Sequence, residues 1–215
     1  MKLRLIQTCV LGALAFSITL AAHATSLYNN LAAVSSGADG VAISGFTNDF
    51  GPLADSFSTG SSAVALTSVT LDLQATNPGD GGIFTVTLDS DNSTSPGSAL
   101  ETIGTISDSS LTSSLADYTL TTDFALSADT RYWIELSSLS PTSSAYWSWS
   151  TDTSGTGVAN EFFWNQGGVH PNSDSPYQMD VEAGAPEPSS LLLLGSGLMM
   201  LAAPLRRRLC AGQRG

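Results

Sequence analysis

Apolar and polar residues alternate along several segments in the middle of the chain. The segment "SSAVALTSVTLDLQ" (61–74) places Val69, Leu71 and Leu73 on one side, with polar residues between them. A period of two is typical of a β-strand with one face in the core and the other in water. The same pattern recurs at 81–91, 116–126 and 130–138, and a last strand is predicted at 177–183.

Turn-forming residues separate these segments. The stretch 77–82 reads Asn-Pro-Gly-Asp-Gly-Gly, and Ser95-Pro96-Gly97 follows the second segment. Proline fixes φ and glycine tolerates positive φ, so both stretches are typical of turns. Short strands at this spacing predict an all-β fold over residues 25–183, either an antiparallel β-sandwich or a jelly roll.

The first 24 residues have the composition of a secretory signal peptide. Lys2 and Arg4 precede an apolar run at 11–20, and small residues follow at Ala22 and Ala24. Signal peptidase accepts small residues in this arrangement. A buried N-terminal helix is the alternative interpretation, but the order basic, apolar, small favours a signal helix at 1–24. The mature chain is then expected to begin near Thr25.

The last segment, 184–215, combines a short apolar stretch with a basic end. Leu191 to Leu205 is 15 residues long, which as a helix reaches about 22 Å against a hydrocarbon core of about 30 Å. A transmembrane helix at about 189–205 would therefore be a marginal permanent anchor and suits a temporary one. Arg206, Arg207 and Arg208 would stay on the cytoplasmic side and stop export.

Charge is distributed unevenly along the chain. Between residues 25 and 185 there are 18 acidic residues and one basic residue, Arg131, which gives a formal charge of −17. Nucleic-acid binding depends on Lys and Arg, and anionic lipid surfaces attract basic patches. This composition argues against DNA, RNA and direct lipid binding by the exported part.

Both cysteines lie outside the exported part, at Cys9 and Cys210. Residues 25–185 therefore contain no cysteine for a disulfide, a thiolate zinc site or a thiol nucleophile. We expect the fold to be held together by its core.

Candidate catalytic residues are few. His170 is the one histidine of the exported part and could serve as the base of a Ser-His-Asp hydrolase, but it lies in a predicted loop and no G-x-S-x-G motif is present. Carboxylate pairs could support glycoside hydrolysis, although most acids fall on wet strand faces or in turns. We expect no catalytic residue and no cofactor.

One short segment has the oxygen ligands that calcium favours. Asp89, Asp91 and Asn92 lie in "DSDNST", but the glycine at the sixth position of an EF-hand loop is missing. A solvated turn is the favoured interpretation, so we expect no metal.

An aromatic cluster is the strongest candidate for ligand binding. Trp147 and Trp149 share one face of a predicted strand, and Trp164 follows in "NEFFWNQGG". Exposed indoles beside Asn, Gln and Ser could stack on sugar rings. Packing in a core that lacks disulfides is the favoured alternative.

Three stretches resemble the choice-of-anchor domains of bacterial surface proteins, type R in particular. They are "DSFSTGSSAVALTSVTLDL" from Asp55, "GIFTVTLDSDNSTSPGSAL" from Gly82 and "LSADTRYWIEL" from Leu126. The resemblance covers about residues 50–181. It implies a module carried in front of a C-terminal anchor, and it brings no catalytic residues.

The C-terminal segment resembles the PEP-CTERM sorting signal, with Pro186, Glu187 and Pro188, a Leu- and Gly-rich stretch and the arginine cluster 206–208. This resemblance implies recognition by an exosortase, a membrane-embedded cysteine peptidase-transferase, and removal of the tail. It also implies delivery to the surface or exopolysaccharide matrix of a Gram-negative bacterium. A simple single-span anchor is the alternative; a GPI signal typically ends without a basic stop.

Together these features predict a non-catalytic surface or matrix protein. Its expected partners are signal peptidase and exosortase during export, the inner membrane transiently, and exopolysaccharide afterwards. The alternative function is a carbohydrate-binding module that uses exposed tryptophans.

Overall fold

The computed structural model describes residues 24–41, 50–75, 77–78, 81–138 and 145–184. The signal segment before Ala24 and the whole sorting tail from 185 onward lie outside the described residues, and so do their predicted helices. Within the described residues, no helix is long and apolar enough to cross a membrane.

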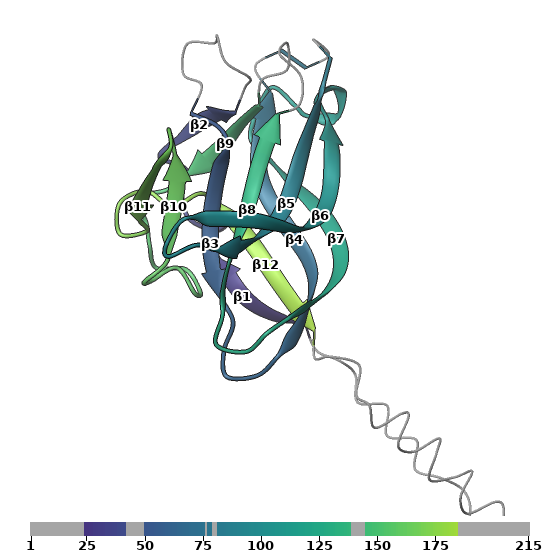
Figure 1. Ribbon diagram of the computed structural model, residues 1–215. Helices are drawn as coiled ribbons and strands as arrows, with labels where there is room; N and C mark the ends of the chain where they lie inside the picture. Colours follow the sequence, from purple (N-terminus) through teal and green to yellow (C-terminus); the bar gives the residue numbers. More distant parts are fainter. Residues whose placement is uncertain (1–23, 42–49, 76, 79–80, 139–144, 185–215) are drawn as a thin grey trace, which may run out of the picture.

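The described residues form an all-β structure of two antiparallel sheets (Figure 1). The first sheet contains β1 (Thr25–Asn29), β12 (Met179–Gly184), β4 (Val64–Ala75), β9 (Ala145–Trp149), β2 (Gly37–Val41) and β7 (Ala116–Leu126). The second contains β11 (Gly168–Pro171), β10 (Phe162–Asn165), β3 (Leu53–Ser58), β8 (Arg131–Ser138), β5 (Ile83–Asp91) and β6 (Pro96–Ser107). A single 3₁₀ turn, Asp108–Ser110, joins β6 to β7 in this part of the chain.

One apolar core fills the space between the sheets, the arrangement expected of a β-sandwich. The alternating residues predicted to face inward on β4 and β5 are buried, including Leu71, Leu73, Val86 and Leu88. Each buried apolar side chain of this size contributes about 1.5 to 3 kcal/mol of transfer free energy. The prediction that the alternating apolar residues of these strands form the core is therefore confirmed.

Strand β7 lies at an edge of the first sheet, where it pairs with β4. Its alternation is as predicted, but its inward residues Tyr118, Leu120 and Phe124 are half-buried because they pack at the margin of the core. The exposed residues on the other face of the strand are Asp117, Thr119, Thr121, Asp123 and Ala125.

The turn before β6 differs from the prediction. Pro96 and Gly97 belong to β6 itself, and the reversal occurs just before them, where Asn92 N donates to Ser95 O at 2.9 Å. Ser93 and Thr94 have φ of 54° and 76°. Two non-glycine residues therefore adopt the positive φ angles of this turn, and the Pro-Gly pattern did not predict this.

The two ends of the domain lie side by side. β1 pairs with β12 in antiparallel register, with Thr25 opposite Ala183 and Asn29 opposite Asp180 (Figure 1). The first and last strands therefore stabilise each other, and both ends of the domain lie at one place on its surface.

Candidate functional site

Trp147 does not belong to an exposed binding surface. Its side chain is fully buried (0% exposed), its ring stacks on Tyr177 at 4.8 Å between centroids, and its Nε1 donates to Gln178 O at 2.9 Å. Burying an indole with its N–H paired is favourable. Core packing, the favoured interpretation of the sequence, is therefore confirmed for Trp147, and the alternative of an exposed sugar-stacking residue is wrong for it.

The other two tryptophans of the cluster are half-buried. Trp149 packs against the core, and its ring lies so close to Gly37 that a Cβ there would collide with it. Trp164 lies on β10, opposite Ala54 of β3. The three indoles therefore do not form one exposed platform.

His170 lies on the short strand β11, whereas the sequence predicted a loop. Its ring stacks on Phe163 with 5.0 Å between centroids. Among the hydrogen bonds of the described residues, none joins this imidazole to a serine hydroxyl or a carboxylate.

The segment with possible calcium ligands, for which a solvated turn was the favoured interpretation, makes contacts within the fold. Asp91 Oδ1 accepts from Trp133 Nε1 at 2.9 Å and from Thr94 N at 3.3 Å. No group of three or more His, Cys, Asp or Glu among the described residues could hold a metal ion. Asp91 acts here as the acceptor that pairs a buried indole and closes the turn.

A pair of carboxyl groups on neighbouring strands was not predicted. Asp89 lies on β5 and Glu135 on β8, two residues apart in register, since Thr87 is the residue opposite Glu135. Burial, followed by the charge of the Asp89 carboxyl and the hydrogen bond with it, raises the pKa of Glu135 to about 7. Burial also raises the pKa of Asp89. A hydrogen bond joins the two side chains, and two carboxyl groups can form such a bond only when one of them carries a proton.

A second polar cluster is enclosed between the sheets around Asp55. This carboxyl accepts from Tyr177 N at 2.8 Å, from Asn172 Nδ2 at 3.0 Å and from Tyr28 OH at 3.4 Å. Burial raises the pKa of Asp55 well above its ordinary value. Because these three bonds run to distant parts of the chain, the cluster joins both sheets and has a structural role.

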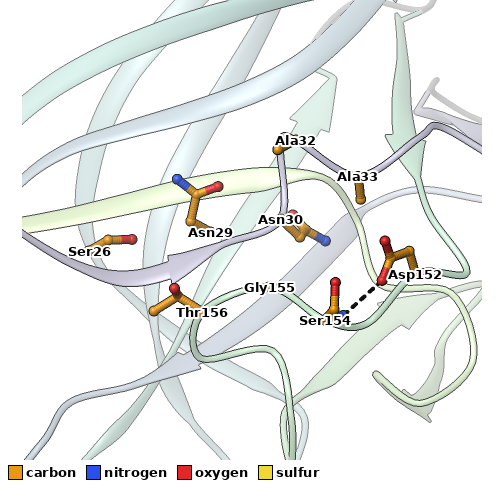
Figure 2. A pocket seen from close by; sticks show the side chains of 9 residues that line it. All are labelled: Ser26, Asn29, Asn30, Ala32, Ala33, Asp152, Ser154, Gly155 and Thr156. Carbon is orange, nitrogen blue, oxygen red and sulfur yellow. Dashed lines mark hydrogen bonds between the residues drawn. The ribbon is translucent and has the colours of Figure 1, made fainter.

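An open polar pocket of about 360 Å³ lies between β1 and the loop that follows β9 (Figure 2). One wall carries Ser26, Asn29 and Asn30 with the adjoining Ala32 and Ala33, and the other carries Asp152, Ser154, Gly155 and Thr156. Nothing in the local sequence predicted it, since its walls are more than a hundred residues apart along the chain.

Backbone contacts hold the two walls together. Asn29 N donates to Thr156 O and Thr156 N donates to Asn29 O, both at 2.9 Å. A Cβ at Gly155 would collide with Asn29 O, and Gly157 has φ of 71° and lies against Leu27 O. Glycine at these two positions is what lets the loop approach β1.

Comparison of the chain with protein-family models and with curated proteins found no relative. No protein-family model matches the chain, and the curated proteins contain no sequence similar to it.

Proposed function

We propose that the chain is an exported, non-catalytic surface or matrix protein, delivered through a PEP-CTERM/exosortase sorting signal. One observation carries the proposal: the folded domain occupies the part of the chain that such processing would leave. β1 begins at Thr25, directly after the expected signal cleavage, and β12 ends at Gly184, two residues before the Pro-Glu-Pro triplet.

The shape of the domain supports this role. Its terminal strands β1 and β12 pair with each other, and the core side chains of the described residues lie between Tyr28 and Val181. A domain of this kind can be exported, folded and separated from its tail without losing a core element. The finer architecture proposed is a β-sandwich of the choice-of-anchor type, with helices at 1–24 and about 189–205 used only during export.

Replacement of the sorting triplet tests the proposal. The variant Pro186→Ala/Glu187→Ala/Pro188→Ala, expressed in a Gram-negative host with an exosortase, is expected to stay in the inner-membrane fraction with its tail attached. The control Ser189→Ala/Ser190→Ala changes the neighbouring residues and should be released like the native chain. If the triplet variant reaches the surface or medium in the native amount, the sorting proposal is wrong.

A further inference from the structure

We propose that the pocket between β1 and the 152–156 loop is a binding site for a neutral, hydroxyl-rich ligand, a sugar ring or short neutral glycan. The inference rests on the proposed function only for the source of the sugar, which would be the surrounding matrix. The site itself is argued from its own groups.

The free hydrogen-bonding capacity of the pocket is concentrated on the loop wall. On the β1 wall, Asn30 Nδ2 is engaged by Tyr177 O at 3.0 Å and Ser26 Oγ by Asp180 Oδ1 at 3.1 Å. On the loop wall, Asp152 is exposed and its Oδ1 accepts from Ser154 N at 3.0 Å (Figure 2). An ionised carboxylate has about four acceptor positions, so Asp152 can also accept from a ligand. The exposed hydroxyl of Thr156 also faces this space.

The charge of Asp152 selects among ligand classes. Hydrogen bonds from the Ser154 side chain and backbone lower the pKa of Asp152, so the carboxyl is ionised at neutral pH. An ionised carboxylate accepts strongly from ligand hydroxyls and repels anions, and the lining residues include no Lys or Arg. Anionic sugars and phosphates are therefore disfavoured.

Other ligand classes fit the lining less well. Calcium takes six to eight oxygen ligands, usually with several carboxylates, and Asp152 is the one carboxylate that lines the pocket. An apolar ligand would find only the methyl groups of Ala32 and Ala33. A sugar ring matches both parts of the surface, since its hydroxyls can bond to Asp152 and Thr156 while its C–H face lies on the alanines.

The pocket is formed before any ligand arrives. The paired bonds between Asn29 and Thr156 and the close approach of Gly155 fix the distance between its walls. Its volume of about 360 Å³ falls at the lower end of the roughly 300 to 1,000 Å³ typical of small-molecule sites. A preformed site avoids the entropy cost of ordering a loop on binding.

Binding is measured on the full chain, purified in a detergent without a sugar headgroup. Saturation-transfer NMR with glucose, galactose, mannose and N-acetylglucosamine is expected to show binding of at least one of them, and glucuronate should bind more weakly. Asp152→Asn should weaken the affinity at least tenfold, and Thr156→Val should weaken it while leaving the shape of the wall unchanged. The control Asp123→Asn makes the same charge change on β7, at the opposite edge of the sheet, and should leave the affinity unchanged.

Three results would overturn the proposal: no neutral sugar binds, Asp123→Asn reduces binding as much as Asp152→Asn does, or calcium chloride binds at Asp152 while sugars do not. Processing in cells is a separate readout. A chain that is sorted normally but binds no sugar overturns the pocket assignment alone, and a chain that binds sugar but keeps its tail overturns the sorting proposal alone.

Discussion

At the scale of single residues, the Asp89–Glu135 pair shows how burial changes an ordinary acid. Asp89 is almost completely buried (3% exposed), and its Oδ1 has no hydrogen-bond partner among the described residues. Two carboxylates so placed are costly to ionise together. The pair therefore links the stability of the domain to pH near neutrality.

Stability is predicted to fall as the pH rises from about 4.5 to about 7. Glu135 has an ordinary pKa of 4.5, raised to about 7 in the fold, so over this window the unfolded chain releases a proton that the folded chain retains. The loss should reach about 1 to 2 kcal/mol, after discounting the full shift for partial exposure to solvent. Urea unfolding of the mature chain at several pH values measures it.

The variant Glu135→Gln isolates this effect. The amide of the new side chain can still donate to Asp89. The variant should therefore be more stable than the native chain at pH 8 and nearly equal to it at pH 4, and its free energy of unfolding should change less with pH between these values. Glu101→Gln, an exposed change on β6, should keep the native profile. A native pH profile for Glu135→Gln would contradict the assignment.

The alternation of residues predicted which face of a strand each side chain occupies, but not whether that face is covered. Trp147 and Trp149 do share a face, yet Trp147 is in the core and Trp149 packs on Gly37. Asp89 alternates with the buried Val86 and Leu88 of β5 and is itself buried. Whether a strand face is buried depends on strands that are distant in the sequence, so the local pattern of residues does not predict it.

At the scale of elements, the loop after β9 is fixed to β1 by a contact that needs glycine. Gly155→Ala places a methyl group against Asn29 O, an oxygen that also accepts from Thr156 N. We expect a destabilisation of about 1 to 3 kcal/mol, typical of overpacking, together with loss of the pocket. Gly60→Ala is the matched control, because a Cβ there meets open space.

Denaturant midpoints of the two glycine variants provide the measurement. Gly60→Ala should stay within about 0.5 kcal/mol of the native chain, as expected for a surface change. Equal stabilities for Gly155→Ala and Gly60→Ala would mean that the loop is not anchored at β1 as described.

Most of the longer strands were predictable, but β6, with 12 residues, was not, and neither were most of the short strands. β4, β5, β7 and β8 follow the predicted segments within a few residues, because each alternates over at least eight positions. β2 reads "GADGV" and β11 reads "GVHP", and neither has a pattern of its own. Pairing with β9 and β10, respectively, defines them. The pocket was missed for a similar reason, since it exists only where two distant segments meet.

At the scale of the whole molecule, a strongly acidic domain is held together without disulfides. Its charge of −17 between residues 25 and 185 opposes compaction, while the shared core and the Asp55 cluster join the two sheets. Arg131 forms an ion pair with the buried Glu161, in which Arg131 Nε donates to Glu161 Oε2 at 2.9 Å. The core side chains that the structure describes lie between Tyr28 and Val181, within the part of the chain that the proposed processing would release.

The intact mass of the protein recovered from the cell surface or medium tests the central claim most directly. We predict one species that begins near Thr25 and ends between Ala185 and Pro188, the two ends that flank β1 and β12. A mature chain that still carries the final "CAGQRG" would show that the tail is a permanent anchor and would contradict this account.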